Sequence, residues 1–245
     1  MFTKITLENF RSFDHIELDL TEKGNTAKHL AILYGENGAG KSNLMSAFVL
    51  LPELTRTMDA RAAYERILAQ GAIFQDENME KEMREHIRQR LRDMSAIIKD
   101  YQMADCENPI IAEYEFNIDG NNGCYRVEFG QDEILHERLE YVLNRRRGLY
   151  FDCSATGINI NDSIIEKEQG KEFLADVKEM AKRYWGKHSL LAILIYEMKD
   201  KSNSFGRDNI TENFNAVLNE FRNLSCTVSM GDKSWEGLHA QLKVL

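Results

Sequence analysis

The stretch LAILYGENGAGKSNLMSAF, residues 30–48, decides how this chain is expected to fold. Its first five residues are mostly apolar and do not alternate with polar ones, which is typical of a central strand covered on both faces. A glycine-rich turn follows. The next residues place four apolar side chains on one helical face: Leu44, Ala47, Phe48 and Leu51. The order strand, glycine-rich loop and helix predicts a phosphate-binding loop.

The spacing of Gly35, Gly40, Lys41 and Ser42 fits the motif GxxxxGK[S/T]. Glycine permits the tight turn and lets backbone N–H groups surround phosphate oxygens, and the helix N-terminus adds a favourable dipole. Lys41 would reach the terminal phosphates, and the hydroxyl of Ser42 would bind Mg²⁺. The sequence therefore predicts a nucleotide site with a magnesium ion.

Two other classes of nucleotide-binding protein are disfavoured. A GTPase needs a guanine-reading NKxD segment, and the nearest string, GDKSW at 231–235, does not match. A small-molecule kinase usually has an arginine-rich lid, whereas the string NRRRG at 144–148 lies where we expect a β turn.

Strand patterns occur on both sides of the loop. ITLENF at 5–10 and HIELDL at 15–20 alternate apolar and polar side chains, and a short turn joins them. From residue 110 the period of two returns in four segments separated by turn residues: 112–118, 124–129, 134–143 and 148–153. These four segments predict an antiparallel meander.

Helical periodicity replaces the strands between about residues 59 and 104. Seven apolar residues recur there at spacings of three and four: Met79, Met83, Ile87, Leu91, Met94, Ile98 and Tyr101. They predict one long amphipathic helix in an insertion. We interpret its apolar stripe as packed on the domain, with a partner surface as the alternative. Further helices are expected in three segments: 171–185, 189–198 and 208–221.

Composition excludes several classes of protein. A hydrophobic content of 43% and a charged content of 29% are ordinary for a folded soluble domain. No segment approaches the roughly 20 apolar residues of a membrane span, and no signal core is present, so we expect a cytoplasmic protein without membrane contact. The net charge of −9 disfavours nonspecific nucleic-acid binding by the whole molecule. A local basic groove for DNA or RNA stays open.

The four cysteines are widely spaced, at Cys106, Cys124, Cys153 and Cys226. This spacing provides neither paired metal ligands nor a disulfide framework. We expect reduced, mostly buried thiols.

The opening FTKITLENFRSF, the strand HIELDL and the loop region LAILYGENGAGKSNLMSAF together resemble the start of ABC-type ATPases of the SMC, RecF and OLD-nuclease group. The later meander, AEYEFNIDGNNGCYRVEFGQDEILHERLEYV, resembles AAA-family ATPases found with bacterial anti-phage and abortive-infection systems. The strong motifs lie in the first fifty residues. The resemblance implies ATP as the nucleotide, Mg²⁺ as its metal and an ATPase activity that is linked to nucleic-acid processing or antiviral defence.

The resemblance also implies a set of binding residues. In the family, the arginine and serine after the first strand approach the nucleotide, which corresponds to Arg11 and Ser12. The remaining nucleotide-binding residues are expected in and just after the loop: Gly35, Glu36, Asn37, Gly38, Ala39, Gly40, Lys41, Ser42 and Asn43. Ser42 is the expected metal ligand. The family glutamine that senses Mg²⁺ would lie near 189–198, where Tyr196 and Glu197 occur instead.

Hydrolysis in this group needs more than the loop. It needs an acidic pair at the end of a second apolar strand, and the closest string, LAILIYE at 191–197, has Tyr196 where a metal-binding aspartate should be. We therefore interpret this string as a buried helix. The partner-donated signature is also missing, because NLSCTVSMG at 223–231 lacks a glycine after its first serine. No catalytic residue is assigned, and we expect an N-terminal portion or a truncated product that binds ATP without turnover.

Together these observations predict an α/β P-loop NTPase lobe of ABC ATPase type, with an antiparallel β-meander, a helical insertion and a helical C-terminal part. The expected divisions are 1–58 for the P-loop core, 59–106 for the insertion, 107–160 for the meander and 161–245 for a helical segment that starts a second lobe. The predicted function is an ATP-driven switch that forms a homo-oligomer. The alternative is a non-hydrolysing nucleotide-binding module whose insertion recruits an effector protein.

Overall fold

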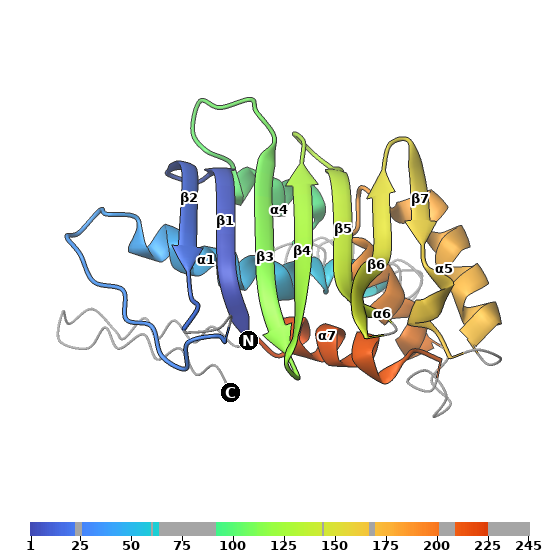
Figure 1. The fold of residues 1–245 in the computed structure, drawn as a ribbon. Helices are drawn as coiled ribbons and strands as arrows, with labels where there is room; N and C mark the ends of the chain where they lie inside the picture. Colours follow the sequence, from blue (N-terminus) through green and yellow to red (C-terminus); the bar gives the residue numbers. More distant parts are fainter. Residues whose placement is uncertain are drawn as a thin grey trace, which may run out of the picture.

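A computed structural model describes residues 1–22, 26–59, 61–63, 92–143, 145–166, 170–200 and 209–224 of the chain. In this part of the chain, one sheet forms a layer whose rear face is covered by helices (Figure 1). The sheet contains seven strands in the order β2-β1-β3-β4-β5-β6-β7, and all neighbours are antiparallel. The strands are β1 Phe2–Phe10, β2 Phe13–Asp19, β3 Ile110–Ile118, β4 Asn121–Phe129, β5 Ile134–Leu143, β6 Arg146–Ser154 and β7 Gly157–Ile160.

The predicted hairpin and meander are confirmed as β1 to β6. Alternation explains them, because Ala112, Tyr114 and Phe116 of β3 are fully buried while Glu113 and Glu115 lie between them on the opposite face. The last strand, β7, was not predicted because its four residues, GINI, are too few to show a period.

The predicted central strand at residues 30–34 is wrong. These residues form no strand, and Leu30, Ile32 and Tyr34 are 71%, 74% and 92% exposed. A strand requires a neighbour for its N–H and C=O groups. The described sheet ends at β2, which pairs only with β1, so the segment that follows has no strand beside it.

The helices are α1 Lys41–Leu54, α4 Met94–Tyr101, α5 Gly170–Tyr184, α6 Leu190–Asp200 and α7 Glu212–Arg222, with a short 3₁₀ turn at Asp162–Ile164. The hydroxyl of Tyr114 donates to the carbonyl of Ala47 at 2.7 Å and fixes α1 against β3. On α7, the ring of Phe221 lies 5.4 Å from those of Phe116 and Tyr125, measured between centroids. The apolar faces of α1 and α7 thus meet the same sheet in one core.

The prediction of one long helix through Tyr101 is wrong in its extent. Asp93 is the N-cap of α4, because its side chain accepts from the amide of Ala96 at 2.8 Å, so the helix begins at Met94. Met94, Ile98 and Tyr101 are buried, which confirms the core interpretation for this part of the stripe. The earlier members of the stripe, Met79 to Leu91, lie outside the described residues.

The helical prediction for the C-terminal part is confirmed by α5, α6 and α7. The hydroxyl of Ser189, just before α6, donates to the carbonyl of Leu54 at the end of α1 at 2.8 Å. These helices therefore pack on the same sheet as the N-terminal elements. The domain boundaries stay predictions.

Three thiols are free, at Cys106, Cys124 and Cys153, whereas Cys226 lies outside the described residues. Burial raises the pKa of Cys124 to about 12, so this thiol stays protonated at neutral pH. Among the described helices, none has the length and apolarity to cross a bilayer.

Candidate phosphate-binding site

The glycine-rich loop leads directly into α1. Gly40 is the N-cap of this helix with φ 84°, a left-handed conformation that favours glycine, and no side chain caps the helix there. The amide of Leu44 donates to the carbonyl of Gly40 at 2.9 Å, so the preceding amides of the first turn have no helical acceptor. The helix therefore offers N–H donors and a positive dipole end to an anion in the loop.

Lys41 spans the loop that precedes it. Its ammonium Nζ donates to the carbonyls of Gly35 at 2.7 Å and Glu36 at 2.6 Å. An ammonium has three N–H donors, so one is left for a phosphate oxygen. The single positive charge is thus held at the mouth of the loop, where the sequence predicted it.

The turn between β1 and β2 forms a second wall of this site. A Cβ added to Gly40 would lie 2.7 Å from Cζ of Phe13 and 3.5 Å from Oγ of Ser12. The amide Nδ2 of Asn43 donates to Oγ of Ser12 at 2.8 Å. The structure therefore brings the predicted residues Ser12, Gly40 and Asn43 together, and adds Phe13.

Arg11 occupies the same turn but faces a different element. Its backbone has φ 53°, and its amide donates to the carbonyl of Tyr101 on α4 at 2.8 Å. Its guanidinium carbon lies 5.0 Å from the centre of the Tyr101 ring, and its Nε is buried without a hydrogen-bond partner in the described part of the chain. A left-handed arginine is strained by about 1–2 kcal/mol, and such strain often marks functional positions.

α4 is fixed next to this turn by polar contacts. The hydroxyl of Tyr101 donates to Oε2 of Glu53 at 2.9 Å, and Arg92 donates to Oε1 of the same carboxylate at 2.7 Å. Burial, together with the charge of Glu53, raises the pKa of Tyr101 far above its ordinary value. The hydroxyl of Tyr101 thus stays protonated and remains a donor. Its hydrogen bond to Glu53 fixes the Tyr101 ring, which contacts Arg11, to the end of α1.

The remaining predicted residues lie on the open side of the loop. Glu36, Asn37, Gly38, Ala39 and Ser42 are exposed, and Ser42 sits in the first turn of α1. Among the described residues, no cluster of three His, Cys, Asp or Glu side chains could hold a metal ion. One hydroxyl fits Mg²⁺ bound mainly by phosphates and water, which is how Mg²⁺ is usually held beside a nucleotide.

The string LAILIYE is part of α6, as predicted, and its acid is remote from the loop. Glu197 is buried, and Lys199 two residues later pairs with Asp59, beyond the end of α1, at 2.8 Å. The start of α6 also contacts the last turn of α1, through Leu54. Since α1 has 14 residues and rises about 1.5 Å per residue, roughly 20 Å separate this end from the loop.

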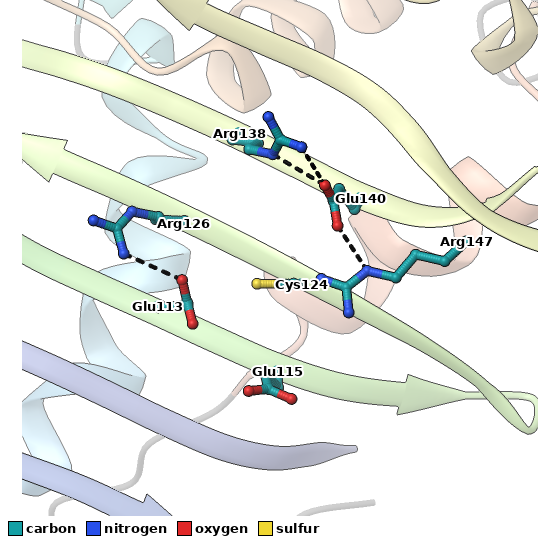
Figure 2. A pocket seen from close by; sticks show the side chains of 7 residues that line it. All are labelled: Glu113, Glu115, Cys124, Arg126, Arg138, Glu140 and Arg147. Atoms are coloured by element: carbon teal, nitrogen blue, oxygen red, sulfur yellow. Dashed lines mark hydrogen bonds and ion pairs between the residues drawn. The ribbon is translucent and has the colours of Figure 1, made fainter.

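A shallow hollow on the uncovered face of the sheet is a weaker candidate. Figure 2 shows most of its charged side chains paired with one another: Glu113 on β3 with Arg126 on β4, and Glu140 on β5 with Arg138 of the same strand and Arg147 of β6. The cations are neutralised by neighbouring carboxylates, so the hollow offers no net charge for a ligand. We interpret it as an ion-pair ladder that stabilises adjacent strands.

Phe13 is the residue that sequence reasoning missed. The available signal was the two-residue connection between Phe10 and Phe13, which are paired across the hairpin. Such a short connection fixes where the tip points.

A glycine-rich loop with a lysine across its mouth, at the start of a helix packed on a sheet, is the arrangement of P-loop nucleotide-binding proteins. The chain belongs to the AAA ATPase domain family, whose profile matches residues 1–230. The lobe is thus an ATP-binding module of ATPase type. A comparison with curated proteins finds no match.

Proposed function

We propose that this chain is the ATP-binding lobe of an ABC-type ATPase of the SMC, RecF and OLD-like group, acting as an ATP-driven switch in bacterial nucleic-acid processing or anti-phage defence. One observation carries the proposal: the ammonium of Lys41 is held by the carbonyls of Gly35 and Glu36 at the open start of α1. The N-terminal motifs support the choice of group.

Each part of the site has a task in ATP binding. The loop amides and the start of α1 surround the β-phosphate, while Lys41 contacts the terminal phosphates. The hydroxyl of Ser42 would hold Mg²⁺, whose charge would offset that of the phosphates. Ser12 and Asn43 hold the hairpin against the helix, and Arg11 reaches the nucleotide from this hairpin after leaving the ring of Tyr101.

The chain alone binds ATP without turning it over. Hydrolysis needs an acidic group that polarises water beside the γ-phosphate. The acid suggested by the sequence, Glu197, belongs to α6 and is about one α1 length from the loop. The proposal therefore places the acid outside the described residues of this lobe.

The alternative, a non-hydrolysing module that recruits an effector through the insertion, has less support. In the described part of the insertion, Met94, Ile97, Ile98 and Tyr101 are buried against the lobe. A helix that has already buried its apolar face has little left to offer a partner.

The test uses stability and turnover together. Mg-ATP at about 100 times its dissociation constant should raise the free energy of unfolding by roughly 2.7 kcal/mol, and should leave Lys41→Ala nearly unchanged. Equal stabilisation of both proteins would exclude the site. Phosphate release by the purified chain should not exceed that of Lys41→Ala. Turnover that this substitution abolishes would show that the chain hydrolyses ATP alone.

A further inference from the structure

The guanidinium of Arg11, in the turn that walls the phosphate-binding loop, has no polar partner. Its Nε is buried, and the side chain has no hydrogen bond or ion pair with any described residue. The guanidinium carbon of Arg92 lies 5.8 Å from the centre of the same Tyr101 ring. Arg92, however, pairs with Glu53 at 2.7 Å and with Asp100 at 2.6 Å. Arg11 therefore keeps N–H donors that a ligand with acceptor oxygens would satisfy.

The end of α4 keeps Arg11 in this place. Tyr101 is the last residue of the helix, and its carbonyl accepts from the amide of Arg11 at 2.8 Å. The centre of its ring lies 5.0 Å from the guanidinium carbon of Arg11, and the ring of Phe10 stacks on the same ring with 5.2 Å between centroids. A cation is favoured both over an aromatic ring and at a helix C-terminus. The observed position of Arg11 is therefore stabilised although its N–H donors lack acceptors.

A nucleotide in the loop would offer the acceptors that this position lacks. Arg11 directly precedes Ser12, whose Oγ accepts from Nδ2 of Asn43 at 2.8 Å and lies 3.5 Å from a Cβ added to Gly40. The side chain of Arg11 thus begins one residue from the wall of the candidate site. Phosphate oxygens accept two parallel N–H bonds from a guanidinium, and such charge-assisted pairs are among the strongest hydrogen bonds in proteins. Arg11 is therefore placed to exchange the ring for a phosphate.

We propose that Tyr101 is a positioning residue for the ATP site, which holds Arg11 on its ring until Arg11 binds a phosphate. The inference rests on the proposed function, in which Arg11 contacts the nucleotide. A contact that exists only in the free lobe lowers the affinity for ATP, because binding has to overcome it. Tyr101 itself stays in place, since its hydroxyl donates to Glu53 at 2.9 Å. ATP binding thereby removes a cation from the end of α4, which links the site to this helix.

Calorimetric titration with Mg-ATP tests this role of Tyr101. Tyr101→Met removes the aromatic face and fills the space with a flexible apolar side chain, so ATP should bind about fivefold more tightly than to the wild type. The conservative variant Tyr101→Phe keeps the ring and should show no such gain. Tyr150→Met removes a buried, hydrogen-bonded tyrosine on β6 and should leave the affinity unchanged. A purely structural role of Tyr101 predicts equal or weaker binding in Tyr101→Met, and that result would overturn the proposal.

A double-mutant cycle shows whether Tyr101 acts through Arg11. With Arg11→Gly in place, the ring has no guanidinium to hold, so adding Tyr101→Met should change the affinity for ATP by less than about twofold. An equal gain with and without Arg11 would mean that Tyr101 acts on the loop by another route, and the proposal would be wrong. Circular dichroism confirms that each variant is folded at the temperature of the titration.

A second measurement is made on the wild type and does not depend on a folded Tyr101 variant. The Nε–H group of Arg11 gives an NMR resonance that is assigned by its loss in Arg11→Gly. Saturating Mg-ATP should shift this resonance together with the amides of residues 35–42, because Arg11 exchanges the Tyr101 ring for a phosphate. Loop amides that shift while the Arg11 resonance stays unchanged would overturn the inference and leave the proposed function standing. If neither shifts, ATP is not bound and both fail.

Discussion

Replacing Glu137 with glutamine should remove a pH dependence of stability that the wild type carries between about pH 4.5 and 7. Glu137 lies on β5 and is fully buried under the start of α6. Its carboxylate accepts from the amide of Leu190 at 2.7 Å, from the indole of Trp185 at 3.0 Å and from the hydroxyl of Tyr125 at 3.0 Å. It thus caps α6 from the sheet.

The magnitude follows from the pKa of this carboxyl. Burial raises the pKa of Glu137 from 4.5 to about 7, and the three donors offset part of that rise because they favour the charged form. The folded state therefore binds the proton more tightly than the unfolded state. This contribution to stability is complete below about pH 4.5 and is lost as the pH rises through 7. At 1.36 kcal/mol per tenfold change, the loss is about 3 kcal/mol.

The assay is urea denaturation at several pH values from 4.5 to 8. The wild type should lose up to about 3 kcal/mol of unfolding free energy across this range, while Glu137→Gln should show little slope, whatever its absolute stability. The exposed Glu133→Gln is the matched control and should keep the wild-type slope. Carboxyls whose pKa is lowered, such as Asp152, act below this range and with the opposite sign. A flat wild-type profile, or an equal slope in Glu137→Gln, would refute the reasoning.

Three further predictions concern the phosphate-binding site and its support. Gly40→Ala should lower the free energy of unfolding by about 2–3 kcal/mol and weaken ATP binding, because an alanine there has a left-handed φ and clashes with Phe13. Gly38→Ala meets no atom within 4 Å and should lower it by only about 1 kcal/mol. Urea denaturation and ATP titration of both variants test this difference. Arg11→Gly relieves a left-handed φ but loses the contact with Tyr101, so the free energy of unfolding should change by less than about 1 kcal/mol. The affinity for ATP should fall about tenfold. A large loss of stability at unchanged affinity would show that the role of Arg11 is purely structural. Tyr114→Phe removes the hydroxyl that donates to the carbonyl of Ala47, so the free energy of unfolding should fall by about 1 kcal/mol. An unchanged urea midpoint would contradict this role.

The strands could be predicted because each has one face on the core and one in solvent. The alternation in β1 to β6 is visible in the sequence itself, as in β3, where the buried Tyr114 and Phe116 alternate with Glu113 and Glu115. The phosphate-binding loop could be predicted because its motif requires particular residues at fixed spacing, and Lys41 lies where the motif places it.

The rest depended on contacts between distant residues. The apolar run at residues 30–34 has the composition of a buried strand, but whether it is one depends on a neighbour that the local sequence does not reveal. The helix that ends at Tyr101 was predicted too long, because the apolar periodicity continues upstream of Asp93. The hydrogen bond from the amide of Ala96 to the side chain of Asp93 caps the helix, which therefore begins at Met94. The contact of Phe13 with Gly40 joins residues 27 positions apart, so the short connection after Phe10 places Phe13 at the hairpin tip but does not reveal its partner.

The most direct test of the central claim is the affinity for Mg-ATP, measured by isothermal titration calorimetry on the wild type, on Lys41→Ala and on Lys99→Ala. Lys99 is an exposed lysine on α4, so its replacement makes the same change of charge away from the loop. The account predicts that the wild type and Lys99→Ala bind one ATP per chain with similar affinity, and that Lys41→Ala shows no measurable binding. Equal affinity in all three proteins, or no binding by the wild type, would contradict it.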